Sequence, residues 1–133
     1  MKPKTSLFIL TSSLLCLTAQ AAKMDPATLP PAADKPGLSF EQDIRPLFQQ
    51  SCFDCHGTAK QKAKLRLDSL PAVLKGSGAG AVVAPGQSDK SKLVYIVTPA
   101  GKKKPAMPPS CKGKPFTTEQ IGLLRAWIDQ GAK

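Results

Sequence analysis

The chain has 133 residues, a formal net charge of +10, 13 prolines, 5% aromatic residues and a single histidine. This length suits one small domain, and the few aromatic side chains leave it little apolar volume with which to build a core unaided. The single histidine excludes every site that needs two imidazoles from one chain. The composition therefore favours one small domain whose core a bound group helps to fill.

The first 21 residues have the pattern of a cleaved export signal. Lys2 and Lys4 are basic, residues 7–17 are apolar but too few to span a bilayer, and Ala19-Gln20-Ala21 places small residues where a signal peptidase cleaves. We therefore expect a signal peptide over residues 1–21 and a mature protein exported to the bacterial periplasm without a transmembrane helix. Loss of the two lysines lowers the formal charge to about +8.

Residues 22–38 carry four prolines and several alanines without apolar periodicity. Such a composition favours an extended, disordered tether. Residues 39–133 then form one domain, in which no internal repeat, heptad or alternating strand pattern appears. The predicted fold class is mainly α, with about three helices joined by long loops rich in glycine and proline.

The first predicted helix begins near Asp43, a good N-cap residue, with Pro46 in its first turn, where a missing N–H is not needed. Apolar residues at positions 44, 47 and 48 follow helical spacing, and the helix leads directly into Cys52.

Two further helices are predicted downstream. One runs from Ser88 or the next residue to Val97, after a Pro-Gly turn. The other is the clearest in the chain, because Thr117 and Gln120 fit a capping box, apolar residues follow on one face, and Gly131 closes the helix.

The stretch "CFDCH" raises the question of chemistry, because paired cysteines at this spacing serve redox centres, zinc sites and haem attachment. A zinc site needs four ligands, and after signal cleavage only one further cysteine, Cys111, and no further histidine remain. A thioredoxin-type pair would lie at the start of a helix in a βαβ unit, whereas this pair follows a helix. A disulfide across so short a loop would be strained and would leave His56 without a role.

Haem c accounts for all three residues of the motif. Cys52 and Cys55 would form thioethers with the two vinyl groups of the porphyrin, and His56 would bind the iron as the proximal ligand. We therefore predict one covalently bound haem c.

The sixth iron position has few candidate ligands. Met24 lies in the predicted tether, whereas Met107 lies 51 residues after His56, between Pro105 and a Pro-Pro pair. Prolines restrict a loop that lacks helix or strand, so they can hold a thioether in place at little further entropic cost. Met107 could instead fill a gap in the core, a common use of methionine. Its polar neighbours favour ligation.

At this point the sequence resembles the planctomycete-type cytochrome c domain, a class I-like family of mono-haem c-type cytochromes. The resemblance covers residues 40–132 in five ordered blocks: "FEQDIRPLFQQSCFDCHG", "KLRLDS", "APGQSDKSKLVYIV", "AMPP" and "FTTEQIGLLRAWIDQGA". It implies a small cytochrome c-like fold with long loops wrapped around one haem, whose axial ligands are His56 and Met107. It also implies that the N- and C-terminal helices cross beside the haem.

Cys111 departs from the pattern of that family. With Cys52 and Cys55 taken by haem it has no partner within the mature chain, so it is a free thiol or links two copies through a disulfide. A competing thiolate ligand at the iron is a weaker alternative that would lower the reduction potential.

Filled axial positions favour outer-sphere electron transfer, so the sequence predicts a non-enzymatic carrier of single electrons, free or as a haem subunit of a larger oxidoreductase. The alternative is a haem-based sensor or small-ligand-binding module with an open or displaceable sixth position, and a peroxidase is a weaker third choice. Arg45 and Arg66 are candidates for contacts with the haem propionates.

Five lysines surround the proposed sixth ligand and could form a docking site. Such a basic collar would steer an acidic redox protein to the haem edge, whereas export and the lack of interleaved aromatic residues disfavour nucleic acid. The predicted docking residues are Lys102, Lys103, Lys104, Lys112 and Lys114.

Overall fold

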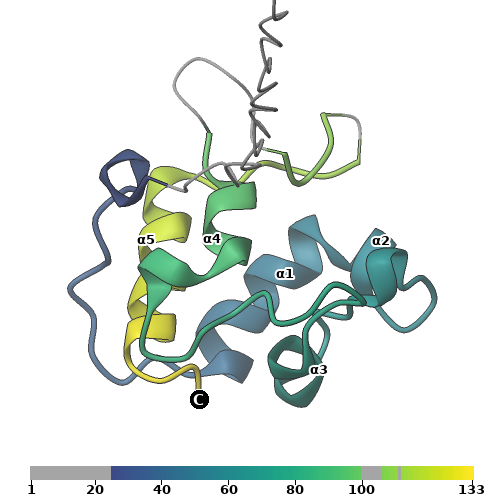
Figure 1. Ribbon diagram of the computed structural model, residues 1–133, viewed down its shortest axis with the longest axis horizontal. Helices are drawn as coiled ribbons and strands as arrows, with labels where there is room; N and C mark the ends of the chain where they lie inside the picture. The colour runs from purple at the N-terminus through teal and green to yellow at the C-terminus, as the bar shows by residue number, and fades with distance from the viewer. Residues whose placement is uncertain (1–24, 100–105, 111) are drawn as a thin grey trace, which may run out of the picture.

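The computed structural model describes residues 25–99, 106–110 and 112–133. The predicted signal peptide, Lys102–Lys104 and Cys111 lie outside the described residues. Within them the chain is mainly helical and has no strand, which confirms the predicted fold class (Figure 1). None of the described helices is long and apolar enough to cross a membrane. The longer helices are α1 (Arg45–Ser51), α2 (Phe53–His56), α3 (Leu70–Lys75), α4 (Lys92–Val97) and α5 (Thr118–Asp129). Short helical turns are η1 (Pro26–Thr28), η2 (Phe40–Ile44), η3 (Lys62–Lys64) and η4 (Ser88–Lys90).

The first helical segment starts earlier than predicted. Ser39, not Asp43, is its N-cap: the Ser39 hydroxyl accepts from the Gln42 N–H, while the Asp43 carboxylate accepts from the Ser39 N–H at 2.9 Å. Its first turns form the π-helix η2, which is wider than an α-helix and continues into α1. Pro46 explains the widening, because its ring clashes with the carbonyl four residues before it and it has no N–H to donate.

The predicted helix over residues 88–97 is interrupted. Ser91 has an extended backbone (φ −83°, ψ 109°) between η4 and α4. Its hydroxyl accepts from the Ala84 N–H at 2.9 Å and donates to the Gln87 carbonyl at 3.0 Å. These side-chain bonds compete with the helical ladder, which is why a serine in this position divides the helix.

Helix α5 agrees with its prediction. Thr117 and Gln120 form the reciprocal capping box, and Gly131 follows the helix with a positive φ of 101°. Helix α3 was not predicted. Ser69 and Pro71 at its start and Gly76 at its end, with φ 82°, were the available signals.

The core joins the first helical segment to the last. Phe40 of η2 packs between Phe48 of α1 and Trp127 of α5, with ring centroids 6.2 and 5.9 Å from that of Phe40. All three side chains are buried, and α4 packs against the same helix α5. The first and last helical segments therefore pack together, as the family resemblance implied, and their place beside a haem stays a prediction.

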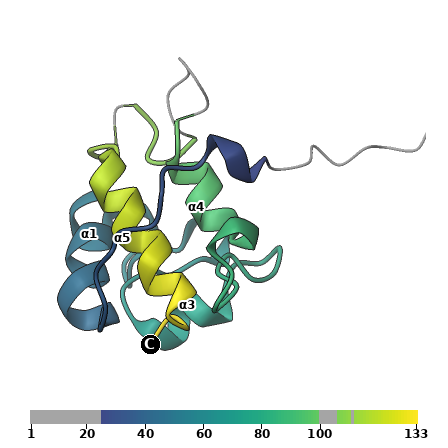
Figure 2. The same cartoon turned by 90° about the vertical axis from the view of Figure 1, so that its left-hand side faces the viewer.

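Residues 25–38, which we call the N-terminal segment, correct the prediction of a disordered tether. The segment is extended but packs along α5 (Figure 2). The Ala33 N–H donates to the Gly122 carbonyl at 2.9 Å, and the Leu38 N–H donates to Gln130 Oε1 at 3.1 Å. Leu29 and Leu38 are buried. Composition alone missed this packing because the partners lie far away at the other end of the chain.

A polar network anchors the N-terminal segment and η4 to α5. The buried Ser88 donates through its N–H and its hydroxyl to the Asp129 carboxylate, at 2.8 and 2.9 Å. Arg125 Nε donates to the Ser88 hydroxyl at 3.1 Å, and its Nη1 donates to the Pro30 carbonyl. Both polar groups of the buried Ser88 have partners in this network, so burying this side chain leaves no unpaired donor or acceptor.

Candidate functional site

The cysteine motif forms one tight helical turn. Helix α1 ends at Ser51, and the Cys52 carbonyl accepts from the N–H groups of Cys55 and His56, at 3.1 and 2.8 Å. A Cβ at Gly57 would lie 2.6 Å from the Phe53 carbonyl oxygen, so only glycine allows the chain to leave α2 in this direction. The turn therefore presents the three chemistry-bearing side chains of the motif from one short helix.

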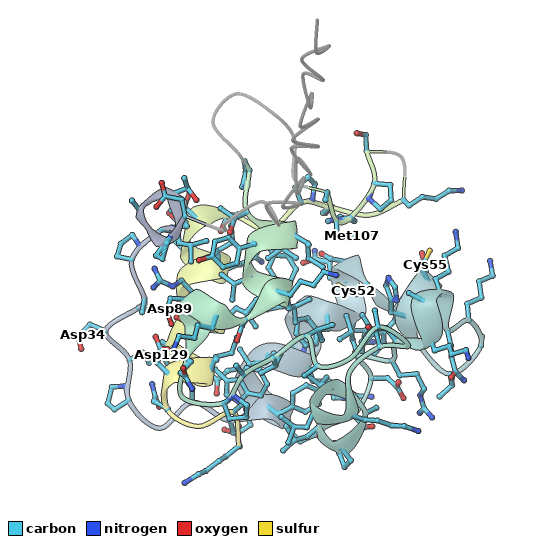
Figure 3. All side chains as sticks on the ribbon, in the orientation of Figure 1. Asp34, Cys52, Cys55, Asp89, Met107 and Asp129 are labelled. Carbon is cyan, nitrogen blue, oxygen red and sulfur yellow. The ribbon has the colours of Figure 1, made fainter. Side chains whose placement is uncertain are left out.

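The loop that carries Met107 is held opposite this turn. The Met107 N–H donates to the carbonyl of Ile96 at 2.8 Å, which ties the loop to α4. The Lys112 N–H donates to the Pro109 carbonyl at 2.9 Å and closes the loop behind Met107. In the side-chain view, Met107 and the two cysteines lie on one side of the molecule, whereas Asp34, Asp89 and Asp129 lie on the other (Figure 3).

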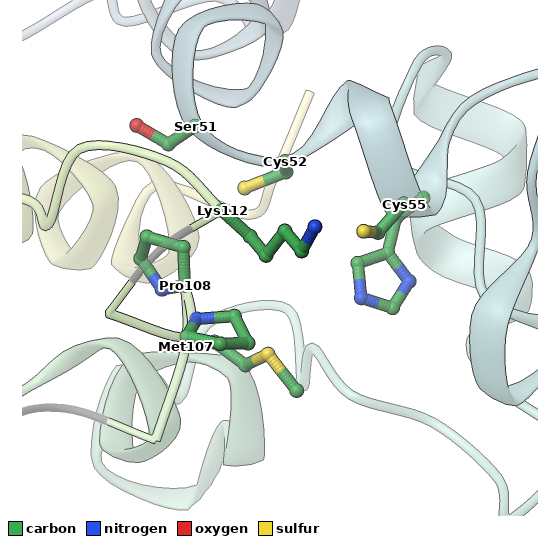
Figure 4. Close-up of a pocket in the computed structure, with 8 residues that line it drawn as sticks. Ser51, Cys52, Cys55, Met107, Pro108 and Lys112 are labelled. Carbon is green, nitrogen blue, oxygen red and sulfur yellow. The ribbon is translucent and has the colours of Figure 1, made fainter.

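Both parts meet at one pocket (Figure 4). Cys52 and Cys55 lie on one side of it, Met107 and Pro108 lie on the other, and Lys112 extends between them. The full lining consists of Ser51, Cys52, Cys55, His56, Met107, Pro108, Pro109 and Lys112. The pocket thus brings together the four predicted haem residues from segments 51 positions apart.

The two cysteines are free thiols in this structure, so the short-loop disulfide considered above is not formed. Burial raises the pKa of the Cys52 thiol to about 12, and the neighbouring Cys55 adds to the shift. A thiol in such a site is neutral at physiological pH. Conversion to an uncharged thioether would therefore place no charge in this apolar environment.

His56 and Met107 both have features of an incomplete site. His56 Nδ1 is buried and has no hydrogen-bond partner among the described residues, a costly arrangement for a polar atom. Met107 is 37% exposed, so its side chain does not fill a gap in the core, which was the alternative considered for it. These two observations, together with two adjacent thiols, fit a site that haem c would complete.

The two arginines predicted to contact the propionates do not line this pocket. Arg66 forms a two-pronged ion pair with Asp68, at 2.9 and 2.6 Å, which raises the pKa of the guanidinium and lowers that of the Asp68 carboxyl. Arg45 donates to the Asp68 carbonyl at 3.3 Å and lies 5.7 Å above the ring of Phe53. Contacts between these arginines and haem remain a prediction.

The docking lysines are only partly described. Lys112 lines the pocket and Lys114 is exposed without lining it. Lys112 also lines a second, adjoining pocket with Lys60, Lys62, Asp54 and Cys55. Lys60 and Lys62 were not among the predicted docking residues, although their position just after the motif was a usable signal.

The remaining lining residues, Ser51, Pro108 and Pro109, were not singled out as site residues. Their positions beside Cys52 and Met107 were the only sequence signal for them. Among the described residues, no group of three or more His, Cys, Asp or Glu side chains is arranged to hold a bare metal ion.

Comparison with known proteins agrees with this site. Searches of curated proteins and of solved structures gave no match. A scan against protein families gave one match, which begins at Cys52 and extends just past Met107, so that it includes all four predicted haem residues. Residues 52–110 match the family described as Planctomycete cytochrome C, and over these residues the match confirms the resemblance drawn from the sequence.

Proposed function

We propose that this protein is an exported mono-haem cytochrome that carries single electrons between redox partners and is not itself an enzyme. The observation that carries the proposal is the pocket lined by Cys52, Cys55, His56 and Met107. Haem c bound there would supply an iron that cycles between its ferric and ferrous states.

The residues of the chain have distinct roles in this proposal. Cys52 at the N-cap of α2 and Cys55 within it would hold haem covalently, and His56 on the same helical turn would bind the iron. Met107 would supply the second iron ligand from the opposite loop, which a hydrogen bond to the Ile96 carbonyl holds in place. Two protein ligands leave no open coordination site, which favours outer-sphere electron transfer over binding of oxygen or peroxide.

Optical spectra of the haem-loaded protein test the axial ligands. The ferric protein should show weak far-red absorption from sulfur bound to iron, and Met107→Ala should lose it. Leu74→Ala is a matched control, because Leu74 is similarly exposed, at 40%, but does not line the pocket. A high-spin ferric spectrum of the unmutated protein would contradict the proposal.

A second candidate function is a haem-based sensor with a displaceable sixth ligand. The position of Met107 in a loop outside the described helices favours it, because a ligand on a loop can move away from the iron without breaking a helix. In that case the ferrous unmutated protein should bind CO readily, whereas an electron carrier should bind CO readily only after Met107→Ala. The same titration therefore separates the two functions.

We also propose that an acidic redox protein docks beside the pocket. Lys112 supports this, because it lines the pocket and, together with Lys60 and Lys62, the adjoining one. The ion pairs found among the described residues involve none of these three lysines, so their charges are available to a partner. Lys102–Lys104 and Lys114 remain predicted members of the same surface.

Stopped-flow electron transfer with an acidic redox protein tests the docking surface. Lys112→Glu should slow the second-order rate at low salt and flatten its decrease with rising ionic strength. Lys92→Glu is the charge-matched control, because Lys92 is exposed on α4 and lines neither pocket. Equal slowing by both variants would assign the effect to net charge and contradict a local docking site.

The proposed location is the bacterial periplasm, where c-type haem is attached outside the cytoplasm. The pattern of residues 1–21 supports export. N-terminal sequencing of the secreted protein should find a chain that begins after Ala21; a chain that begins at Met1 would contradict cleavage.

A further inference from the structure

The two halves of the candidate site come from distant segments, so a contact between these segments must set their separation. The half from α1 and α2 contains Ser51 next to Cys52, and the loop half contains Pro108 next to Met107. The hydrogen bond from Met107 to Ile96 ties the loop to α4, but it does not connect the loop to the helix that carries the cysteines.

Gly113 lies where the two halves touch. A Cβ built on Gly113 would lie 2.8 Å from the Ser51 carbonyl oxygen, and 3.2 and 3.4 Å from Cβ and Cγ of Pro108. Real Cβ atoms do not approach a backbone oxygen this closely. Both neighbours are stiff, since Ser51 is the last residue of α1 and the proline ring cannot rotate away.

Space, not backbone conformation, requires glycine at this position. Gly113 is not among the glycines with positive φ, whereas Gly76 and Gly131 are. An L-residue could therefore adopt its backbone angles, and the restriction comes from the close approach of the returning loop to the end of α1.

We propose that Gly113 is a positioning residue that sets the distance between Met107 and His56. The absence of a side chain at Gly113 lets the returning loop lie directly on the Ser51 carbonyl, with the Pro108 ring against it. An added methyl group must push the returning part of the loop, at Gly113, away from either the end of α1 or the Pro108 ring. Both movements carry Met107 away from the motif, because Pro108 and Cys52 are the adjoining residues.

The inference rests on the proposed ligation by Met107 and is tested in the haem-loaded protein with Gly113→Ala. We expect this variant to lose most of the far-red absorption of the ferric form and to bind CO in the ferrous form about tenfold or more tightly than the unmutated protein. A merely structural role for Gly113 would lower the unfolding temperature without moving either signal.

Gly122→Ala is the matched control. A Cβ on Gly122 would also meet a backbone oxygen, that of Pro31 at 3.0 Å, but this contact lies between α5 and the N-terminal segment. We expect a change in thermal stability with unchanged far-red absorption and CO binding. Equal spectral changes in the two glycine variants would overturn the specific role of Gly113.

The possible failures can be told apart. If Gly113→Ala keeps its far-red absorption and its resistance to CO, the positioning role is wrong and the proposed ligand stands. If the unmutated protein has no far-red absorption, the proposed ligation itself is wrong. If Gly113→Ala does not fold, Pro108→Ala takes its place, because it removes ring atoms from the same contact without adding any. It should change the far-red absorption and the CO affinity in the same direction as Gly113→Ala, but less. Unchanged absorption and CO affinity in Pro108→Ala would overturn the inference.

Discussion

The side of the molecule built on α5 and the side that holds the pocket differ in how completely their groups are satisfied. On the α5 side, Trp127 is fully buried and its indole N–H donates to the Lys133 carbonyl, and the buried Ser88 is bonded to Asp129. On the pocket side, His56 Nδ1 is buried without a partner among the described residues, and Met107 is partly exposed. The protein's own contacts therefore satisfy the α5 side, whereas the pocket side keeps an unpaired buried nitrogen and an exposed thioether, as expected of the proposed haem site.

The largest effect should come from removing both attachment points on the pocket side. Cys52→Ala/Cys55→Ala should abolish covalent haem completely, since no other pair of thiols among the described residues lines the pocket. Haem staining after denaturing electrophoresis measures this. The single variants are the controls, because each retains one thioether and should keep part of the stain. Undiminished staining of the double variant would contradict attachment through these cysteines.

The next effect should come from the core of the α5 side. Trp127→Ala removes a fully buried side chain that packs 5.9 Å from Phe40, which should cost about 3–5 kcal/mol in the free energy of unfolding. Denaturant unfolding followed by circular dichroism measures the loss. Trp127→Phe should cost less, because it keeps most of the ring but not the donor to Lys133. If the far-red absorption disappears before the fold does, the two sides of the molecule do not behave independently.

A smaller effect is expected from the polar network. Asp129→Ala leaves the N–H and the hydroxyl of the buried Ser88 without their acceptor, which should cost about 1–3 kcal/mol. Asp89→Ala is the control, because Asp89 is exposed next to the same serine. Similar losses in both variants would show that charge near η4, not the buried hydrogen bonds, sets stability there.

The smallest effect concerns pH. The Lys35 ammonium, at 2.8 Å, and then the Ser39 N–H lower the pKa of the Asp43 carboxyl below its ordinary value of 3.8. A carboxylate whose pKa is lower in the folded than in the unfolded protein stabilises the fold at pH values above the unfolded pKa. This stabilisation is lost as the pH falls through the folded pKa. The unfolding temperature of Asp43→Asn should therefore fall less than that of the unmutated protein as the pH is lowered from about 5 through the folded pKa of Asp43. Asp34→Asn, at an exposed residue outside the described ion pairs, should follow the unmutated protein; a parallel fall of Asp43→Asn would contradict the linkage.

Local sequence signals predicted the parts of the molecule that depend on near neighbours. The capping box of Thr117 and Gln120 predicted the start of α5. The spacing of the two cysteines and His56 predicted that they share one site, and all three line the same pocket. The signals failed where distant contacts decide. The N-terminal segment looked like a tether because its partners on α5 are more than 80 positions away, and a side-chain hydrogen bond at Ser91 divided a helix that periodicity made continuous.

The packing of the N-terminal segment on α5 also sets an order of events along the chain. The carbonyl of Lys35 accepts from Gln130, 95 positions later, and the Phe40 N–H donates to the carbonyl of Lys133. A chain that emerges from its N-terminus completes the cysteine turn and the Met107 loop before these partners exist. Closing so long a loop is slow and comes late in folding. If haem c is attached as proposed, the motif would be accessible to the attachment machinery during the interval before the two ends of the domain join.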